Sequence, residues 1–143
     1  MMGAKRKYGS VQKAMDTWRD YMVSMGFGYK LGIDLPGEKR GLIPNAEYYD
    51  RAYKGSWNGL TIISISIGQG EVNLTPLQIA NLGATIANRG YYYVPHVVRK
   101  VQGEPLDTLY TRRHVTKASQ RAYEYVVAGM RCSALKGSCM LLG

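Results

Sequence analysis

Residues 66–90, SIGQGEVNLTPLQIANLGATIANRG, join a glycine-rich turn to a helix whose beginning can be recognised from its residues. Thr75 can accept a hydrogen bond from the free amides as the N-cap, a proline follows at the first helical position, and Gln78 can reach back to complete a capping box. Apolar residues then occupy nearly every face of residues 77–87. Because a helix that is apolar all round must be buried, we predict a central helix of the domain here.

Other elements follow from hydrophobic spacing and turn residues. Apolar residues at helical spacing predict a helix over residues 11–25, and further helices are expected to begin near Asn45 and at Ser119. Residues 59–68 fit either a buried strand or a buried helix segment. Residues 91–101 predict an extended strand interrupted by a proline. The residues expected to face the core from the first and last helices are Val11, Met15, Trp18, Met22, Met25, Ala122, Tyr123, Val126, Val127 and Met130.

The composition indicates one folded unit, or a piece of a larger one, with a basic surface. The chain has 143 residues, of which 45% are hydrophobic and 20% charged, and this excludes a disordered chain. No apolar run approaches the roughly 18 residues of a membrane span, and the basic start lacks the apolar region of a signal peptide. The net charge of +9 favours anionic partners. The basic residues form short, scattered clusters, however, as on a solvated surface.

Three short patterns match those of acyl-serine enzymes, in which a lysine one helical turn after the serine takes its proton. S-x-x-K occurs at Ser10–Lys13 and Ser133–Lys136, and S-x-N occurs at Ser56–Asn58. Such patterns arise by chance, and a catalytic serine needs a buried helix N-terminus with a prearranged oxyanion hole. Ser10 lies in a basic tail and Ser133 at the fraying end of the last helix. We therefore predict no catalytic residue in this chain.

No metal or cofactor site is expected. Gly68 and Gly70 do not continue into a dinucleotide-binding or phosphate-binding loop, since position 73 is Asn and no Gly-Lys-Ser/Thr follows. The histidines and cysteines lack the spacing of metal ligands; they are His96, His114, Cys132 and Cys139. The two cysteines leave both a disulfide and two free thiols open.

One carboxylate pair lies on a helix face. Asp16 and Asp20 are separated by about one helical turn. We expect them to interact with basic neighbours on the same helix, Arg19 or Lys13, rather than to act in acid–base chemistry.

Residues 66–98, SIGQGEVNLTPLQIANLGATIANRGYYYVPHVV, closely resemble a stretch of the class B penicillin-binding proteins, the peptidoglycan D,D-transpeptidases of the elongation machinery. Upstream, FGYKLGIDLPGEKRGLIPNAEYYD resembles the family's F-G-x-G-x-x-T-G-I-D-L-P-G-E segment, and downstream VVAGM resembles the helix before the third catalytic motif. The order of G-Q-G-E, T-P-L-Q, I-A-N-x-G and P-H is highly specific. The resemblance implies a partial penicillin-binding/transpeptidase (serine β-lactamase-like) domain, α+β and mainly helical, and favours a helix for residues 59–68.

The resemblance also implies where the chain lies in the family's domain. The nucleophile and S-x-N motifs of the family precede the matched region and K-T-G follows it, so the catalytic residues are expected outside this chain. Residues 1–10 are then a basic tail, residues 11–131 a helical core with short strands, and residues 132–143 an atypical C-terminal tail. Tyr29-Lys30 departs from the family's usual G-K/R-x-T.

The resemblance further implies a reaction. The intact enzyme would attack the D-Ala-D-Ala carbonyl of a peptidoglycan stem peptide with its serine, form an acyl-enzyme and pass the acyl group to an amine, while β-lactams trap the intermediate. It would act at the periplasmic face of the inner membrane, in the cell envelope, without a cofactor. Gly68, Gln69 and Gly70 are expected to line the wall of the substrate cleft. We expect this chain alone to be inactive, to bind no nucleic acid and to self-associate through exposed apolar surface.

Two alternatives stay open. The net charge of +9 would suit a non-catalytic basic module that binds anionic cell-wall polymer or nucleic acid, and such binding would weaken steeply with salt. A degenerate gene product without an independent role is the other.

Overall fold

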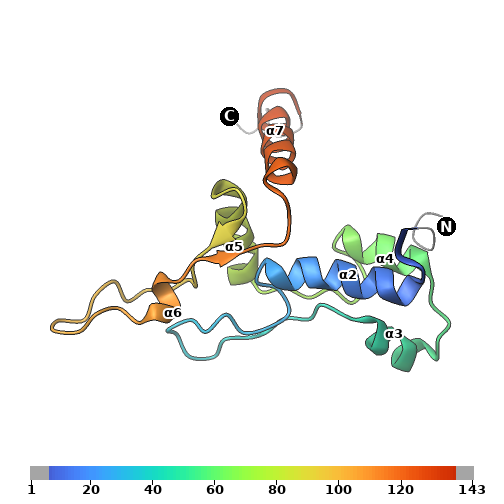
Figure 1. Ribbon diagram of the computed structural model, residues 1–143, viewed down its shortest axis with the longest axis horizontal. Helices are drawn as coiled ribbons and strands as arrows, with labels where there is room; N and C mark the ends of the chain where they lie inside the picture. Colours follow the sequence, from blue (N-terminus) through green and yellow to red (C-terminus); the bar gives the residue numbers. More distant parts are fainter. Residues whose placement is uncertain (1–6, 138–143) are drawn as a thin grey trace.

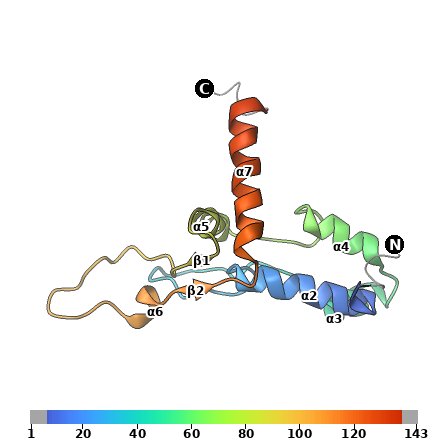
Figure 2. The ribbon, with the colours of Figure 1, turned by 45° about the horizontal axis from the view of Figure 1, so that its top comes forward.

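The computed structural model describes residues 7–137. Its elements are, in chain order, α2 (Val11–Ser24), α3 (Ala46–Tyr53), α4 (Gly59–Ser66), α5 (Pro76–Ala87), β1 (Tyr91–Tyr92), α6 (Thr108–Thr111), β2 (His114–Val115) and α7 (Gln120–Lys136). Figures 1 and 2 show α2, α3 and α4 together at one end of an elongated molecule, with α5 and the strands near the middle and α7 standing away from the rest. The expected mainly helical α+β architecture is confirmed.

The predicted helix starts are confirmed by side chains that cap the first turn. The first long helix begins after Ser10, whose hydroxyl accepts the amide of Lys13 at 3.1 Å. The predicted capping box of α5 is present: Gln78 N donates to Thr75 Oγ1 at 3.2 Å, and Thr75 N donates to Gln78 Oε1 at 3.0 Å. Residues 59–68 contain a helix, as the resemblance favoured. The helices α3, α4 and α7 are capped by Asn45, Asn58 and Ser119.

The larger hydrophobic cluster joins α2, α3 and α4. Trp18 and Trp57 pack against it from its sides. Of the residues expected to face the core from α2, Met15 is fully buried, whereas the others are half-buried. The buried residues of the cluster are Met15, Ala46, Tyr49 and Ile65.

The carboxylate pair of α2 has different partners from those expected. Asp16 accepts the backbone amide of Ala46 at 3.0 Å, which links α2 to the first turn of α3. Asp20 forms an ion pair with Lys117 at 2.9 Å. Arg19 donates from Nε to the carbonyl of Ile43 at 3.3 Å. The expected contacts with Arg19 or Lys13 are wrong, because groups distant in the sequence reach the carboxylates first.

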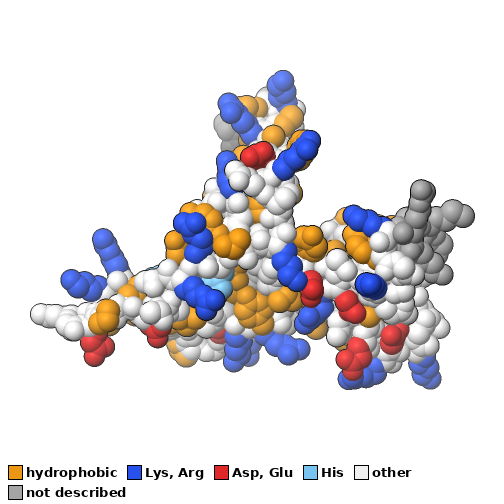
Figure 3. Space-filling view, in the orientation of Figure 1, with side chains coloured by type: hydrophobic (Ala, Val, Ile, Leu, Met, Phe, Trp, Pro, Cys, Tyr) orange, Lys and Arg blue, Asp and Glu red, His pale blue; other side chains and the backbone are white. Residues whose placement is uncertain are grey.

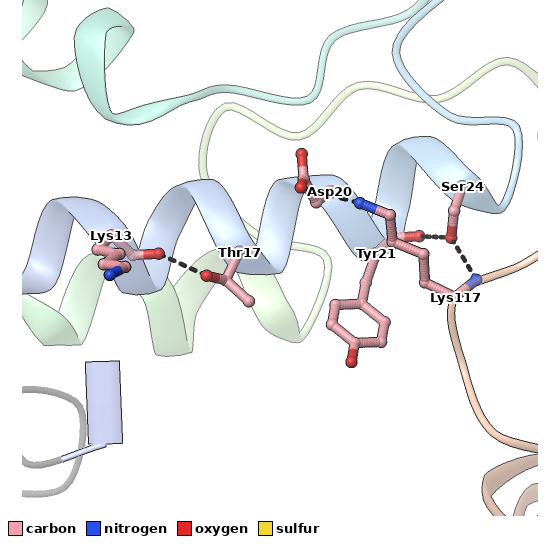
Figure 4. A network of polar contacts seen from close by, with 6 residues as sticks. All are labelled: Lys13, Thr17, Asp20, Tyr21, Ser24 and Lys117. Carbon is pink, nitrogen blue, oxygen red and sulfur yellow. Dashed lines mark hydrogen bonds and ion pairs between the residues drawn. The ribbon is translucent and has the colours of Figure 1, made fainter. Parts of the chain in front are cut away.

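The segment before α7 is held against the last turns of α2, as Figure 4 shows. Besides its ion pair with Asp20, Lys117 donates its backbone amide to Ser24 Oγ at 3.0 Å. Ser24 in turn donates to the carbonyl of Tyr21 at 2.7 Å. One backbone and one side-chain contact therefore fix the point at which the chain turns into α7.

The prediction that α5 buries its apolar residues is wrong. Its buried residues are polar: Gln78 and Asn81 are 2% and 4% exposed and Thr85 is fully buried, whereas Ile79 is 56% exposed. For Gln78 the reason is that it faces backbone groups of the connector between α2 and α3, which need hydrogen-bond donors, whereas Thr85 donates to the carbonyl of Asn81 within α5. Gln78 Nε2 donates to the carbonyls of Tyr29 and Arg40, each at 3.1 Å. The apolar side of α5 faces outward.

The predicted strand over residues 91–101 is reduced to Tyr91–Tyr92. β1 pairs antiparallel with β2 in the register Tyr91↔Val115 and Tyr92↔His114. Pro95 then interrupts the pattern, because proline cannot donate to a ladder. The following amides, those of Val97 and Val98, donate to the carboxylate of Asp34 at 2.9 and 2.7 Å. These hydrogen bonds lower the pKa of Asp34.

The last helix begins at the predicted cap but buries little of its expected core face. Tyr123 is buried and shares a 2.7 Å hydrogen bond with Thr116. Val126 and Met130 are exposed, which contradicts their expected place in the core. The helix continues through Lys136, so residues 132–136 of the expected C-terminal tail are helical. The ribbon views show why the face is open: α7 projects away from the other elements.

Gly41→Ala tests the close packing of the connector on α5. A Cβ at this position would lie 2.5 Å from the carbonyl oxygen of Asn73 and 2.8 Å from Gln78 Oε1, at a φ of +64°. We expect a loss of about 2–4 kcal/mol in the free energy of unfolding, measured by urea denaturation.

The matched control is Gly37→Ala, where φ is +80° but no atom lies within 4 Å of the added Cβ. It should lose only about 1–2 kcal/mol from backbone strain. Equal losses in the two variants would show that the contact with Asn73 and Gln78 is unimportant.

Candidate functional site

The Gly68–Gly70 turn connects α4 to the segment before α5 and is exposed to solvent. Gly68 and Gly70 have φ values of +78° and +70°, a region that glycine occupies without strain. The amide of Gly68 donates to the carbonyl of Ile65 at 3.1 Å, and that of Gln69 to the carbonyl of Ser64 at 3.2 Å. The end of α4 therefore holds the first half of the turn.

Glu71 holds the other side of the turn against α3. Its two carboxylate oxygens accept the hydroxyls of Tyr49 and Tyr53, each at 2.5 Å. These hydrogen bonds, that from Tyr49 most of all, lower the pKa of Glu71. Burial and the same carboxylate raise the pKa of Tyr49. Glu71 is therefore ionised and both tyrosines are neutral near pH 7.

The chain after the turn is attached a second time at Asn73, two residues after Glu71. Leu42 and Asn73 exchange backbone hydrogen bonds, with Leu42 N donating at 2.6 Å and Asn73 N donating at 3.0 Å. The capping box of Thr75 and Gln78 comes next. The residues after the turn are thus tied to α3, to the connector and to α5 in succession.

A cavity of about 280 Å³ lies beside the turn, between α3 and α4. We call it the Glu71 cavity. Trp57 is oriented there by Asp50, whose carboxylate accepts the indole Nε1–H at 2.6 Å. The ring of Tyr49 lies 5.5 Å from that of Trp57 and 5.8 Å from that of Tyr53. Its lining consists of Tyr49, Tyr53, Ser56, Trp57, Thr61, Ser64, Gly70 and Glu71.

The sequence predicted the turn but missed its attachment. Tyr49 and Tyr53 are one helical turn apart and so share a face of α3, which is a signal available in the sequence. Glu71 carries no such signal, because its partners are 22 and 18 residues away.

The serines of the short catalytic patterns are scattered. Ser10 caps α2, and Asn58 of the S-x-N pattern caps α4 by accepting the amide of Leu60 at 2.9 Å. Ser133 lies within α7, where its carbonyl accepts the amide of Gly137 at 3.1 Å. Ser10 and Asn58 begin different helices. The structure therefore assigns helix-capping roles to Ser10 of the first S-x-x-K pattern and to Asn58 of the S-x-N pattern.

The histidines and cysteines are likewise separate. His96 donates from Nδ1 to the carbonyl of Val94 at 2.9 Å, and the ring of His114 stacks on Tyr92 at 5.1 Å. Cys132 is exposed and unpaired. Cys139 lies outside the described residues. Within residues 7–137, no group of three or more His, Cys, Asp or Glu side chains is arranged to hold a metal ion.

A second, larger hollow of about 610 Å³ lies between α2 and α4. Its walls are mainly apolar and include Trp18, Met22 and Met25, three of the residues that the sequence assigned to the core face of α2. Leu60 and Ile63 of α4 border it and are each 61% exposed. Figure 3 shows apolar side chains at the surface in several places on the face that it draws.

Comparison with known proteins assigns the family. Residues 8–140 match the model of the penicillin binding protein transpeptidase domain. The chain therefore belongs to the penicillin-binding protein transpeptidase family. It is 46% identical over 92 residues to the peptidoglycan D,D-transpeptidase MrdA of Acinetobacter baumannii, which amounts to 64% of this chain and 14% of that protein.

Similar solved structures indicate which type of penicillin-binding protein the chain belongs to. PBP2 of Pseudomonas aeruginosa, solved in complex with WCK 5153, is 28% identical with a TM-score of 0.72; the match covers 87% of this chain and 28% of that one. PBP2 of Helicobacter pylori, solved in complex with MreC, is 27% identical with a TM-score of 0.60, over 85% of this chain and 21% of that one. The chain is thus of the elongation type of class B penicillin-binding proteins, as the sequence resemblance indicated.

Replacing Glu71 with Gln tests the charge at the turn. Because folding lowers the pKa of Glu71, its contribution to the free energy of unfolding is present above the unfolded pKa and lost as the pH falls through the folded pKa. Wild type should exceed Glu71→Gln in stability near neutral pH, and the two should converge as the pH falls below the ordinary range of a glutamate carboxyl. Urea denaturation over this pH range measures the difference.

Glu47→Gln is the matched control, since the ion pair of Glu47 with Arg51 is exposed on the surface of α3. Its effect should be small at every pH. A difference between wild type and Glu71→Gln that does not change with pH would contradict the role of the ionised carboxylate.

Proposed function

We propose that this chain forms part of the substrate-binding wall of a peptidoglycan D,D-transpeptidase, with Gly68, Gln69 and Gly70 lining the cleft. The observation that carries the proposal is a turn that is exposed to solvent and yet attached on both sides, by the end of α4 and by Glu71. A binding loop needs this combination, because its backbone must be accessible and already in place. The name of the MrdA relative supplies the substrate class.

For the intact protein we propose the acyl-serine reaction that the family resemblance implies. A serine outside this chain would attack the stem peptide, and an amine would take the acyl group. The protein would work in the cell envelope, at the periplasmic face of the inner membrane. Among the helices of residues 7–137, none combines the length and the apolar character needed to cross a bilayer.

This chain alone should not react with penicillin. Ser10 is engaged as a helix cap and Ser133 lies inside α7, so neither has the arrangement of a nucleophile at a buried helix N-terminus. We expect no covalent band with a fluorescent penicillin on a denaturing gel. A band that disappears in Ser10→Ala or Ser133→Ala would refute the proposal that the chain is inactive alone.

The alternative of a basic module that binds anionic polymer has weaker support. Figure 3 shows Lys and Arg side chains distributed over the whole visible face rather than gathered in one patch. Two of the described cations are engaged in ion pairs, Arg51 with Glu47 and Lys117 with Asp20. A scattered distribution favours solubility more than a specific polyanion site.

We also infer that the isolated chain self-associates through α4. Leu60 and Ile63 of α4 are each 61% exposed and border the hollow against α2, and Ile67, the C-cap of α4, is 68% exposed. Contiguous apolar surface of this kind favours a second copy in water. Sedimentation velocity should show concentration-dependent association that Ile63→Lys weakens, whereas Val115→Lys, at a 71% exposed position in β2, should not. A monomer at all concentrations would contradict the inference.

A further inference from the structure

The Glu71 cavity combines a carboxylate with aromatic rings and hydroxyls. Tyr53 and Trp57 form part of its wall, and the hydroxyls of Ser56, Thr61 and Ser64 lie around it. Aromatic faces attract cations, and a carboxylate accepts hydrogen bonds from them. Its volume of about 280 Å³ suits one small functional group rather than a whole peptide.

Glu71 has no cationic partner within the described part of the chain. The ion pairs found among residues 7–137 are Arg51 with Glu47 and Lys117 with Asp20. The tyrosine hydroxyls take one acceptor position on each carboxylate oxygen. An ionised carboxylate has about four acceptor positions, so Glu71 keeps about one beyond those used by the two hydroxyls and by its own backbone amide. A cation that reaches the cavity would therefore meet an ionised carboxylate that is not already paired within the described residues.

We propose that the Glu71 cavity binds a primary alkylammonium group, such as the side-chain amine of a diamino acid. The ammonium would donate to the free acceptor position of Glu71 and to the hydroxyls, with its carbon chain along the rings of Tyr53 and Trp57. This inference rests on the proposed function, because a peptide that contacts the Gly68–Gly70 turn would bring an amine-bearing side chain to Gly70 and Glu71. The amine site would give the proposed substrate-binding wall a preference for peptides that carry an amine-bearing side chain.

The test is a titration of the full chain followed by two-dimensional NMR. The ligand is Nα-acetyl-lysine methylamide, and the control ligand is Nα-acetyl-norleucine methylamide, which lacks the amine. The indole N–H of Trp57 is the reporter, and that of Trp18, in the hollow between α2 and α4, is the internal reference. We expect saturable shifts at Trp57 with the lysine ligand, none with the norleucine ligand, and no change at Trp18.

Two variants separate the charge of Glu71 from its hydrogen bond with Tyr53, because the carboxamide of a glutamine can still bond a tyrosine hydroxyl. Glu71→Gln removes the charge and should weaken binding of the lysine ligand at least about tenfold. Tyr53→Phe keeps the charge and frees an acceptor position, so its binding should equal or exceed that of wild type. Glu47→Gln should bind as wild type does.

Several results would overturn the assignment: no saturable shift at Trp57, equal shifts with the norleucine ligand, unchanged binding in Glu71→Gln, or loss of binding in both Glu71→Gln and Tyr53→Phe. A peptide ending in D-Ala-D-Ala provides a separate readout at the amides of Gln69 and Gly70. If the lysine ligand binds but this peptide does not shift those amides, the cleft-wall proposal fails and the amine site stands. The reverse result removes the amine site alone.

Discussion

The carboxamide of Gln78 is the interaction on which the arrangement of the middle of the molecule depends. Its oxygen accepts the amide of Thr75, and its nitrogen donates to the carbonyls of Tyr29 and Arg40. One side chain, 2% exposed, therefore closes the first turn of α5 and holds a connector that has little regular structure of its own. An apolar residue here would leave two carbonyls and one amide without partners, each at a cost of about 1–3 kcal/mol where it is buried.

This constraint explains which parts of the fold could be predicted from the sequence. Caps such as Ser10, Thr75 and Ser119 act within one helical turn, so the residues that mark a helix start are neighbours in the sequence. The orientation of α5 depends instead on carbonyls at residues 29 and 40, which lie far upstream. Apolar periodicity indicates a helix, but the polar backbone it meets decides which face turns inward. The same limit applies to Val126 and Met130, whose exposure depends on what stands next to α7 rather than on their spacing.

The candidate site also has a part that the sequence predicts and a part that depends on residues distant in the chain. Glycines with positive φ are recognisable as a turn, and the family resemblance supplied the interpretation of a cleft wall. The attachment of that turn could not be predicted from local sequence, because Glu71 accepts hydrogen bonds from two tyrosine hydroxyls of α3, 22 and 18 residues earlier in the chain. Asp34 shows the same limit, since it accepts the distant amides of Val97 and Val98. Glu38 accepts the amides of Leu31 and Gly32, which lie within the same connector. Carboxylates that satisfy backbone amides replace the ladders that this part of the chain lacks.

The net charge of the chain and the local charge of Glu71 influence binding over different distances. Screening in physiological salt has a length of about 8 Å, so the +9 charge influences how the chain approaches a partner more than how a group binds within the cavity. Inside it, the hydrogen bonds from Tyr49 and Tyr53 keep Glu71 ionised, and the nearby rings exclude part of the solvent that would weaken its field. A basic chain can therefore carry a local site of the opposite sign. The tyrosines that position the turn also maintain that charge, so in the proposed cleft wall the shape of the turn and the preference for an amine would depend on the same two hydroxyls.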